Sequence, residues 1–483
     1  MSSARQQGGS GQRAAHIGRD LTTGSIPRHV IAFSMPMLAG NLLQTAYSLI
    51  NAFWVGKFLG TTALAAITVS LPAVFVLIAV AAGLTLATNI LVAQYYGARD
   101  WQSIRRVVNT SVVLVGGLSF AFLALGLLLA PRLLKAINTP PEVLPMATGY
   151  MRIFLWTLPC GFGIFLIGSM LRGIGDSKTP VYFQTVSVGL NTVLDPLLMF
   201  GWLGFPRLGL NGTACASIIS QAAAVVALMI YVQRRRQLVT PEWRRLRVDV
   251  PTAWLLVKIG FPAMIQQSVV SVSMLVILSF VSRFGENADA AFGAALRIDQ
   301  VAFLPALTIG MAVSTLAGQN IGAKRFGRVR EVFWWGILLS GAISLVISAV
   351  AITVPEVLLR AFVNGAQVIA IGSSYLRIVG ITYALYAVYF VSNGVINGAG
   401  HTQWTTLISV IGLWGVRLPL AAVLPRNLHS VKGVWWAMLI SVGASVLLSL
   451  AYYSFGRWKE PVIRANAAPP GGPSSNPSGP AHR

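Results

Sequence analysis

Charged residues are scarce in this sequence: Asp, Glu, Lys and Arg make up 10% of its 483 residues, against roughly 25% in an average soluble domain. Acidic residues are rarer still, with 13 Asp and Glu against 36 Lys and Arg. Hydrophobic residues make up 55%, and the mean hydropathy is +0.70. This composition excludes an ordinary water-soluble domain and predicts an integral membrane protein.

Cysteine and histidine are also rare, with two and five residues. Cys160 and Cys215 both fall in apolar segments, where they offer neither a disulfide across a loop nor a metal-ligand spacing. The histidines lie in the predicted tails or loops: His16, His29, His401, His429 and His482. No group of His, Cys and acidic residues meets the geometric needs of hydrolysis or metal catalysis, so we expect neither an enzyme nor a cofactor.

Long apolar segments follow one another along the whole chain. Each reaches the roughly 20 residues that a helix needs to cross about 30 Å of hydrocarbon. They lack the short alternating pattern of barrel strands. The twelve segments lie near 30–55, 64–94, 107–130, 144–170, 180–202, 208–233, 252–282, 290–319, 331–354, 371–396, 402–425 and 432–456. The sequence therefore predicts an all-α, polytopic membrane protein with twelve transmembrane helices.

The net charge of +23 is distributed unevenly. The tails, the even-numbered loops and the linker after the sixth segment carry roughly twice as many Lys and Arg as the other side, which predicts cytoplasmic termini in a cell (inner) membrane. The densest cluster, at 234–250, is expected to touch anionic lipid headgroups. It belongs to no nucleic-acid-binding module, so we expect no nucleic acid as a partner.

An internal repeat appears at a shift of about 225 residues. VAQYYGAR at 92–99 matches AGQNIGAK at 317–324, and LRGIGD at 171–176 matches INGAGH at 396–401. The repeat predicts two pseudo-symmetric six-helix bundles around a central cavity, related by an axis along the membrane normal. We expect the protein to be a monomer. The predicted parts are a cytoplasmic N-terminal tail (1–29), a first lobe (30–233), a basic cytoplasmic linker (234–251), a second lobe (252–456) and a disordered C-terminal tail (457–483).

One carboxylate stands out in the fifth segment. Asp195 is the only acidic residue between Asp176 and Glu242. A carboxylate at the centre of a membrane helix costs roughly 2.5 to 3.5 kcal/mol and usually marks an ion or substrate path. Asn191 lies one helical turn earlier on the same face, and Pro196 frees a backbone carbonyl. This cluster of oxygens could hold a proton or Na⁺; the alternative is a structural Asp bonded to a neighbouring helix.

The first segment carries a polar stripe. Gln44, Tyr47 and Asn51 recur at helical spacing on an otherwise apolar helix. A lipid-facing amide would leave its hydrogen bonds unmade, so these side chains are candidates for a cavity wall. The alternative is that they bond neighbouring helices and never meet substrate.

The second half offers further polar candidates for the substrate cavity. They are Gln266, Gln267, Tyr386, Asn393 and Asp299. Tyrosine faces suit an organic cation or a planar compound, although such tyrosines more often pack. Asp299 and Arg297 fall near a predicted membrane boundary, where a snorkelling charge pair is the default interpretation and a role in transport the alternative.

Several motifs in this order resemble the MATE (multidrug and toxin extrusion) family over residues 25–456. They are GTTALAAITVSLP, VAQYYGARD, LRGIGDSKTP, NTVLDPLLMFGWLGFPRLGLNGTACASIISQ and LRIDQVAFLPALTIGMAVSTLAGQNIGAKR. The resemblance implies an antiporter that expels small organic, often cationic, compounds in exchange for H⁺ or Na⁺. It also implies that Asn191 and Asp195 bind the coupling cation.

The chain departs from the family pattern at three acidic positions. Asn51 stands where many relatives carry an Asp in the first segment, and Gln266 or Gln267 and Tyr386 stand where others carry acids. Asn51 can still ligate sodium or hydrogen-bond the acid through its amide. We hypothesise that protonation of Asp195 changes its bonds to Asn191 and Asn51 and thereby the helix packing.

Other functions remain open from the sequence. A lipid-linked oligosaccharide flippase of the same superfamily would need cations for its diphosphate, and Arg283, Arg297 and Arg417 are candidates near predicted segment ends. A simple channel fits less well, because tandem halves with a single acid suit exchange better than a selectivity filter.

Overall fold

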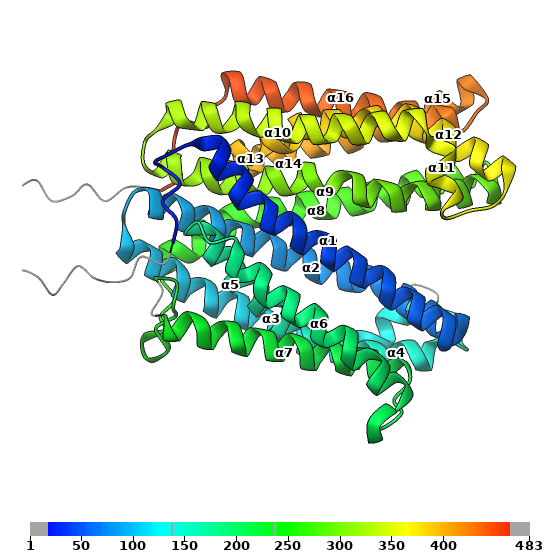
Figure 1. Cartoon of the computed structure of the whole chain (residues 1–483), viewed down its shortest axis with the longest axis horizontal. Helices are drawn as coiled ribbons and strands as arrows, with labels where there is room; N and C mark the ends of the chain where they lie inside the picture. Colours follow the sequence, from blue (N-terminus) through cyan, green and yellow to red (C-terminus); the bar gives the residue numbers. More distant parts are fainter. Residues whose placement is uncertain (1–17, 137–138, 236–237, 464–483) are drawn as a thin grey trace, which may run out of the picture.

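The computed structural model describes residues 18–136, 139–235 and 238–463, and these fold entirely into helices and connecting turns (Figure 1). The helices are α1 (Ile26–Phe58), α2 (Gly60–Gly97), α3 (Trp101–Ala136), α4 (Leu144–Phe154), α5 (Thr157–Gly173), α6 (Lys178–Phe200), η1 (Trp202–Gly204), α7 (Leu210–Arg234), η2 (Trp243–Arg245), α8 (Val250–Ser282), α9 (Glu286–Gly322), α10 (Phe326–Thr353), α11 (Pro355–Arg360), α12 (Ala366–Val379), α13 (Ile381–Gly398), α14 (Thr402–Val410), η3 (Ile411–Arg417), α15 (Leu418–Leu428) and α16 (Lys432–Phe455).

Most of these helices can cross a membrane. Within the described residues, eight spans are long and apolar enough, and the bent pairs α4/α5 and α12/α13 would each make one more. The more polar α1 and α6 have 33 and 23 residues, and at about 1.5 Å per residue both exceed the roughly 30 Å of a hydrocarbon core. The prediction of an all-α membrane protein with twelve transmembrane elements is confirmed.

The helices form two bundles (Figure 1). Helices α2–α7 make the lower bundle, α8–α16 make the upper bundle, and α1 crosses between them. Helix α2 packs against α8 and α9 at the junction, whereas α1 contacts both α6 and α9. The bundles lie close together at the end that carries residues 18–25, here named the tail end, and they spread apart toward the opposite end.

Small residues allow close packing inside the second bundle. A Cβ added at Gly394 of α13 would lie 2.4 Å from the carbonyl oxygen of Gly310 in α9. Since apolar side chains gain little by leaving lipid, membrane helices associate through such close backbone contact. The α9/α13 pair is therefore a fixed unit of the second bundle.

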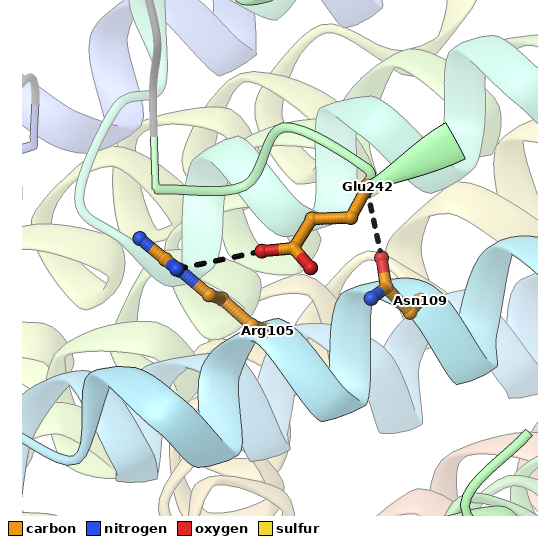
Figure 2. Close-up of polar contacts among 3 residues, drawn as sticks. All are labelled: Arg105, Asn109 and Glu242. Carbon is orange, nitrogen blue, oxygen red and sulfur yellow. Dashed lines mark hydrogen bonds and ion pairs between the residues drawn. The ribbon is translucent and has the colours of Figure 1, made fainter. Parts of the chain in front are cut away.

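The linker between the bundles lies along α3 (Figure 2). The backbone N–H of Glu242 donates to Asn109 Oδ1 at 3.0 Å, and Arg105 Nη1 lies 3.4 Å from the Glu242 carboxylate. Farther along, Asp249 caps α8 by accepting from the N–H of Thr252 at 3.0 Å. The linker is thus anchored to the first bundle, while its predicted contact with lipid headgroups stays a prediction.

Two boundaries differ from the sequence-based expectation. Helix α1 begins at Ile26, and the residues before it pack against the second bundle, with Leu21 only 1% exposed. At the other end, Trp458 and Ile463 are each 5% exposed and join the cores of the second and the first bundle. The rest of the predicted disordered tail, 464–483, lies outside the described residues.

Replacing Gly394 with leucine tests the α9/α13 contact. Overpacking of this kind costs about 1–3 kcal/mol, so Gly394→Leu should lower the thermal unfolding midpoint in detergent. Gly341→Leu in α10 is the matched control, since a Cβ there meets none of the described atoms within 4 Å. Equal midpoints for the two variants would contradict the packing account.

Candidate functional site

Asp195 lies inside the first bundle, on α6. Its side chain is 4% exposed, and its Oδ2 accepts a hydrogen bond from the Tyr47 hydroxyl of α1 at 3.1 Å. The apolar residues around it exclude water, so the few polar groups that reach it define its chemistry. The structure therefore brings together two residues that the sequence singled out separately.

Asn191 faces the neighbouring helix α7. Its Nδ2 donates to Ser217 Oγ at 3.3 Å. Helix α7 can approach because Gly212 lies against the backbone of α6, where an added Cβ would come within 2.6 Å of the Leu198 carbonyl oxygen. Ser217 and Gly212 were not among the predicted site residues.

Three buried oxygens of the predicted cation site have no hydrogen-bond partner within the described residues. They are Oδ1 of Asp195, Oδ1 of Asn191 and Oδ1 of Asn51. Carboxylate and carbonyl oxygens suit hard cations, whereas no group of three or more His, Cys, Asp or Glu in the described chain could hold a transition metal. The donor set fits a proton on Asp195 or Na⁺ near it.

Tyr150 also belongs to the surroundings of Asp195. It lies on α4, is 8% exposed, and interacts electrostatically with the Asp195 carboxyl group. The internal repeat held a signal for it, because a shift of 225 residues pairs Tyr150 with Tyr375, which binds the buried acid of the second bundle.

Asp299 is the buried acid of the second bundle. It is 3% exposed, and its two oxygens accept from the hydroxyls of Tyr375 and Tyr383 at 2.5 Å each. These tyrosines lie on α12 and α13, on either side of a 41° bend. The default interpretation of a snorkelling pair is wrong for Asp299; Arg297 is exposed, with its guanidinium 5.9 Å from the ring centre of Phe362.

Arg417 is a second buried charge in this bundle. It is 7% exposed, closes the π-helical segment η3, and donates through Nε to Ser441 Oγ at 2.9 Å. It lies within the span Thr402–Leu428, so its assignment to a segment end is wrong. The burial of Arg417 could not be predicted from the lengths of the apolar segments.

Two candidates of the second bundle serve as ties between its helices. Gln266 donates to Ser409 Oγ at 2.8 Å, and Asn393 accepts from Ser449 Oγ at 3.1 Å. Hydrogen bonds of this kind contribute modestly to helix association in membranes. Their role in a substrate cavity stays a prediction.

The remaining candidates are more accessible. Gln267 is exposed, and Gln44 is exposed and accepts from Gln184 at 3.4 Å. Tyr386 is half-buried, with its ring 4.6 Å from that of Phe303. Exposed amides and a partly open aromatic ring are able to meet a small organic molecule.

Two helical bundles with charged groups buried inside each are the architecture expected of a membrane transporter. Comparison with known proteins narrows this class. A family model described as MatE matches residues 36–197 and 262–423, one match in each bundle. The chain belongs to the MatE family of transporters, which confirms the resemblance drawn from its motifs.

Individual relatives agree with this assignment. The chain is 33% identical to the probable multidrug resistance protein YoeA of Bacillus subtilis (strain 168), over 91% of this chain and 96% of that protein. It is also 33% identical to the probable multidrug resistance protein YpnP of the same organism, over 91% and 97%. Its fold is similar to a solved outward-facing MATE transporter of the MOP superfamily, with a TM-score of 0.85, 22% identity and coverage of 91% and 97%.

Removal of one tyrosine hydroxyl tests the Asp299 cluster. Tyr383→Phe leaves a buried carboxylate oxygen without its donor, which costs about 1–3 kcal/mol and should lower the unfolding midpoint. Tyr386→Phe is the control, because its ring packs against Phe303. A midpoint for Tyr383→Phe no lower than that of the control would show that the cluster is not a structural tie.

Proposed function

We propose that the protein is a cation-coupled antiporter that exports organic, often cationic, compounds by alternating access, with Asp195 as the coupling carboxylate. The observation that carries this proposal is the arrangement at Asp195, where Oδ2 accepts from Tyr47 and Oδ1 is buried with no hydrogen-bond partner among the described residues. A carboxylate held half-satisfied among apolar helices is ready to gain a proton or Na⁺. The names of the relatives support the efflux of drugs as the reaction class.

The coupling step is a change in the bonds of Asp195. A proton or Na⁺ neutralises the carboxylate and weakens the charge-assisted hydrogen bond from Tyr47, because such bonds depend on the ionised acceptor. Tyr47 lies on α1, so its release alters the packing of α1 on α6. Asn191 and Asn51 supply the amide oxygens beside the bound cation.

Helix α1 can carry this change to the second bundle. Six residues before Tyr47, Asn41 donates through Nδ2 to Thr308 Oγ1 of α9 at 3.0 Å. One helix thus bonds the coupling acid of the first bundle and the central helix of the second. A shift of α1 moves both contacts together. Coupling between distant sites requires an element of this kind, which has two arrangements and is influenced by both sites.

The orientation follows from the charge distribution. We place the tail end in the cytoplasm of a cell with the protein in its cell (inner) membrane, since Lys and Arg accumulate on that side. The bundles then spread apart toward the outside, as in an outward-open state (Figure 1). The proposed contacts of the substrate are Gln44, Tyr47, Gln266, Gln267, Tyr386, Asn393 and Asp299, and the protein works as a monomer.

Asp195→Asn tests the coupling in proteoliposomes with pH and sodium gradients set independently. The variant keeps the size of the side chain but cannot gain a charge or a proton, so gradient-driven efflux of an organic cation should fall at least about tenfold. Glu286→Gln, exposed in the first turn of α9, is the control and should transport normally. Near-normal efflux by Asp195→Asn under both gradients would refute the proposal, and the gradient that drives the parent identifies the ion.

Arg417 supports a second candidate, a lipid-linked oligosaccharide flippase. A buried cation inside a bundle could meet the diphosphate of such a lipid. This function predicts that a lipid diphosphate raises the unfolding midpoint of the purified protein and that Arg417→Met abolishes the rise. Stabilisation by organic cations alone, unchanged in Arg417→Met, would favour the antiporter.

A further inference from the structure

Two glutamines cross-link the bundles at the tail end. Gln94 of α2 donates through Nε2 to the carbonyl oxygen of Gly398 in α13, at 2.7 Å. Gln319 of α9 donates through Nε2 to the carbonyl oxygen of Gly173 in α5, at 2.9 Å. Both glutamines are fully buried, and each bond runs from one bundle to the backbone of the other.

The two bonds are equivalent under the internal repeat. A shift of 225 residues relates Gln94 to Gln319 and Gly173 to Gly398. One cross-link is therefore the pseudo-twofold copy of the other. An interface of this kind is self-complementary, as in a symmetric dimer. We name these two glutamines and their two acceptor carbonyls the paired glutamine lock.

Two glycines make the lock possible. A Cβ at Gly97 would lie 1.8 Å from the backbone oxygen of Gln319, and a Cβ at Gly322 would lie 1.9 Å from the backbone oxygen of Gln94. Each distance is far inside a van der Waals contact, so no side chain larger than hydrogen fits at either position with the tail end closed. These glycines are again 225 residues apart.

Residues 18–24, named the strap, break the symmetry of the lock. The N–H of Leu21 donates to Gln319 Oε1 at 3.0 Å, while the N–H of Arg19 donates to the carbonyl oxygen of Ile174 at 3.0 Å. The strap therefore bonds both bundles. Gln94 Oε1, by contrast, is buried and has no hydrogen-bond partner in the parts of the chain that the structure describes.

We propose that the paired glutamine lock and the strap hold the tail end closed, and that Gln94 and Gln319 set the balance between the two access states. Opening the tail end breaks both cross-links and exposes two glycine carbonyls and two amides. The strap adds to the Gln319 side only, so that side is the stronger half of the lock. This inference depends on the alternating access proposed above, but its test reads conformation and not transport.

The test measures the distance between two spin labels at the tail end. Cys160 and Cys215 are first replaced by alanine, and labels are attached through Gln102→Cys and Gly327→Cys, exposed positions on α3 and α10 that are also 225 residues apart. Gly327 tolerates a side chain, because no described atom lies within 4 Å of an added Cβ. Double electron–electron resonance in lipid nanodiscs gives the populations of the closed and open tail end.

Removal of either glutamine side-chain donor should open the tail end. One net buried hydrogen bond corresponds to about a fivefold change in population, so Gln94→Leu should raise the longer-distance population about fivefold. Gln319→Leu also loses the hydrogen bond from the N–H of Leu21 and should raise the longer-distance population further. Gln403→Leu, an exposed position at the same end of the second bundle, is the matched control and should leave the distances unchanged.

A second pair of variants reaches the same state by steric means. Gly97→Ala and Gly322→Ala force the bundles apart without removing a hydrogen-bonding side chain, and alanine is the better helix former, so folding is retained. Unchanged distances in both the glutamine and the alanine variants would overturn the proposal. If the parent shows no antiport but these variants open the tail end, the lock stands and the proposed function fails; if the parent transports and the variants stay closed, only the lock fails.

Discussion

Asp195 is a carboxylate enclosed by apolar helices, where an ionised group is costly. Asp195 is 4% exposed, and the hydrogen bond that reaches its carboxylate comes from a tyrosine of another helix. Tyr47 reaches it from α1, and that same helix bonds the second bundle through Asn41. Helix α1 therefore contacts the buried acid of one bundle and a helix of the other.

The two bundles share an internal repeat, which is closely matched at the tail end and differs in the buried groups of the interior. At the tail end the copies are nearly identical, with glutamines, glycines and carbonyls exchanged in pairs. In the interior they diverge, since Asp195 of the first bundle is bonded by one tyrosine, whereas Asp299 of the second is bonded by two and lies in a bundle that also buries Arg417. The symmetric part suits an interface that opens and closes, while the divergent part suits binding.

Much of the fold was predictable from the sequence, because a helix that crosses the membrane needs a long apolar segment regardless of which helices pack against it. Asp195 and Asn191 were predictable too, since a charge in such a run is costly on its own account. Ser217 and the tyrosines around Asp299 were not, because each reaches its partner from another helix. The burial of Arg417 was not predictable either, because the length of a segment does not show which face of its helix packs against protein and which faces lipid.

The last described residues bear on where the chain can be shortened. Trp458 fills the core of the second bundle, and Ile463 fills that of the first, so one short peptide after α16 spans both halves. A protein trimmed for crystallisation directly after Phe455 would lose a buried hydrophobic side chain from the core of each half. Such trimming should therefore leave Trp458 and Ile463 in place.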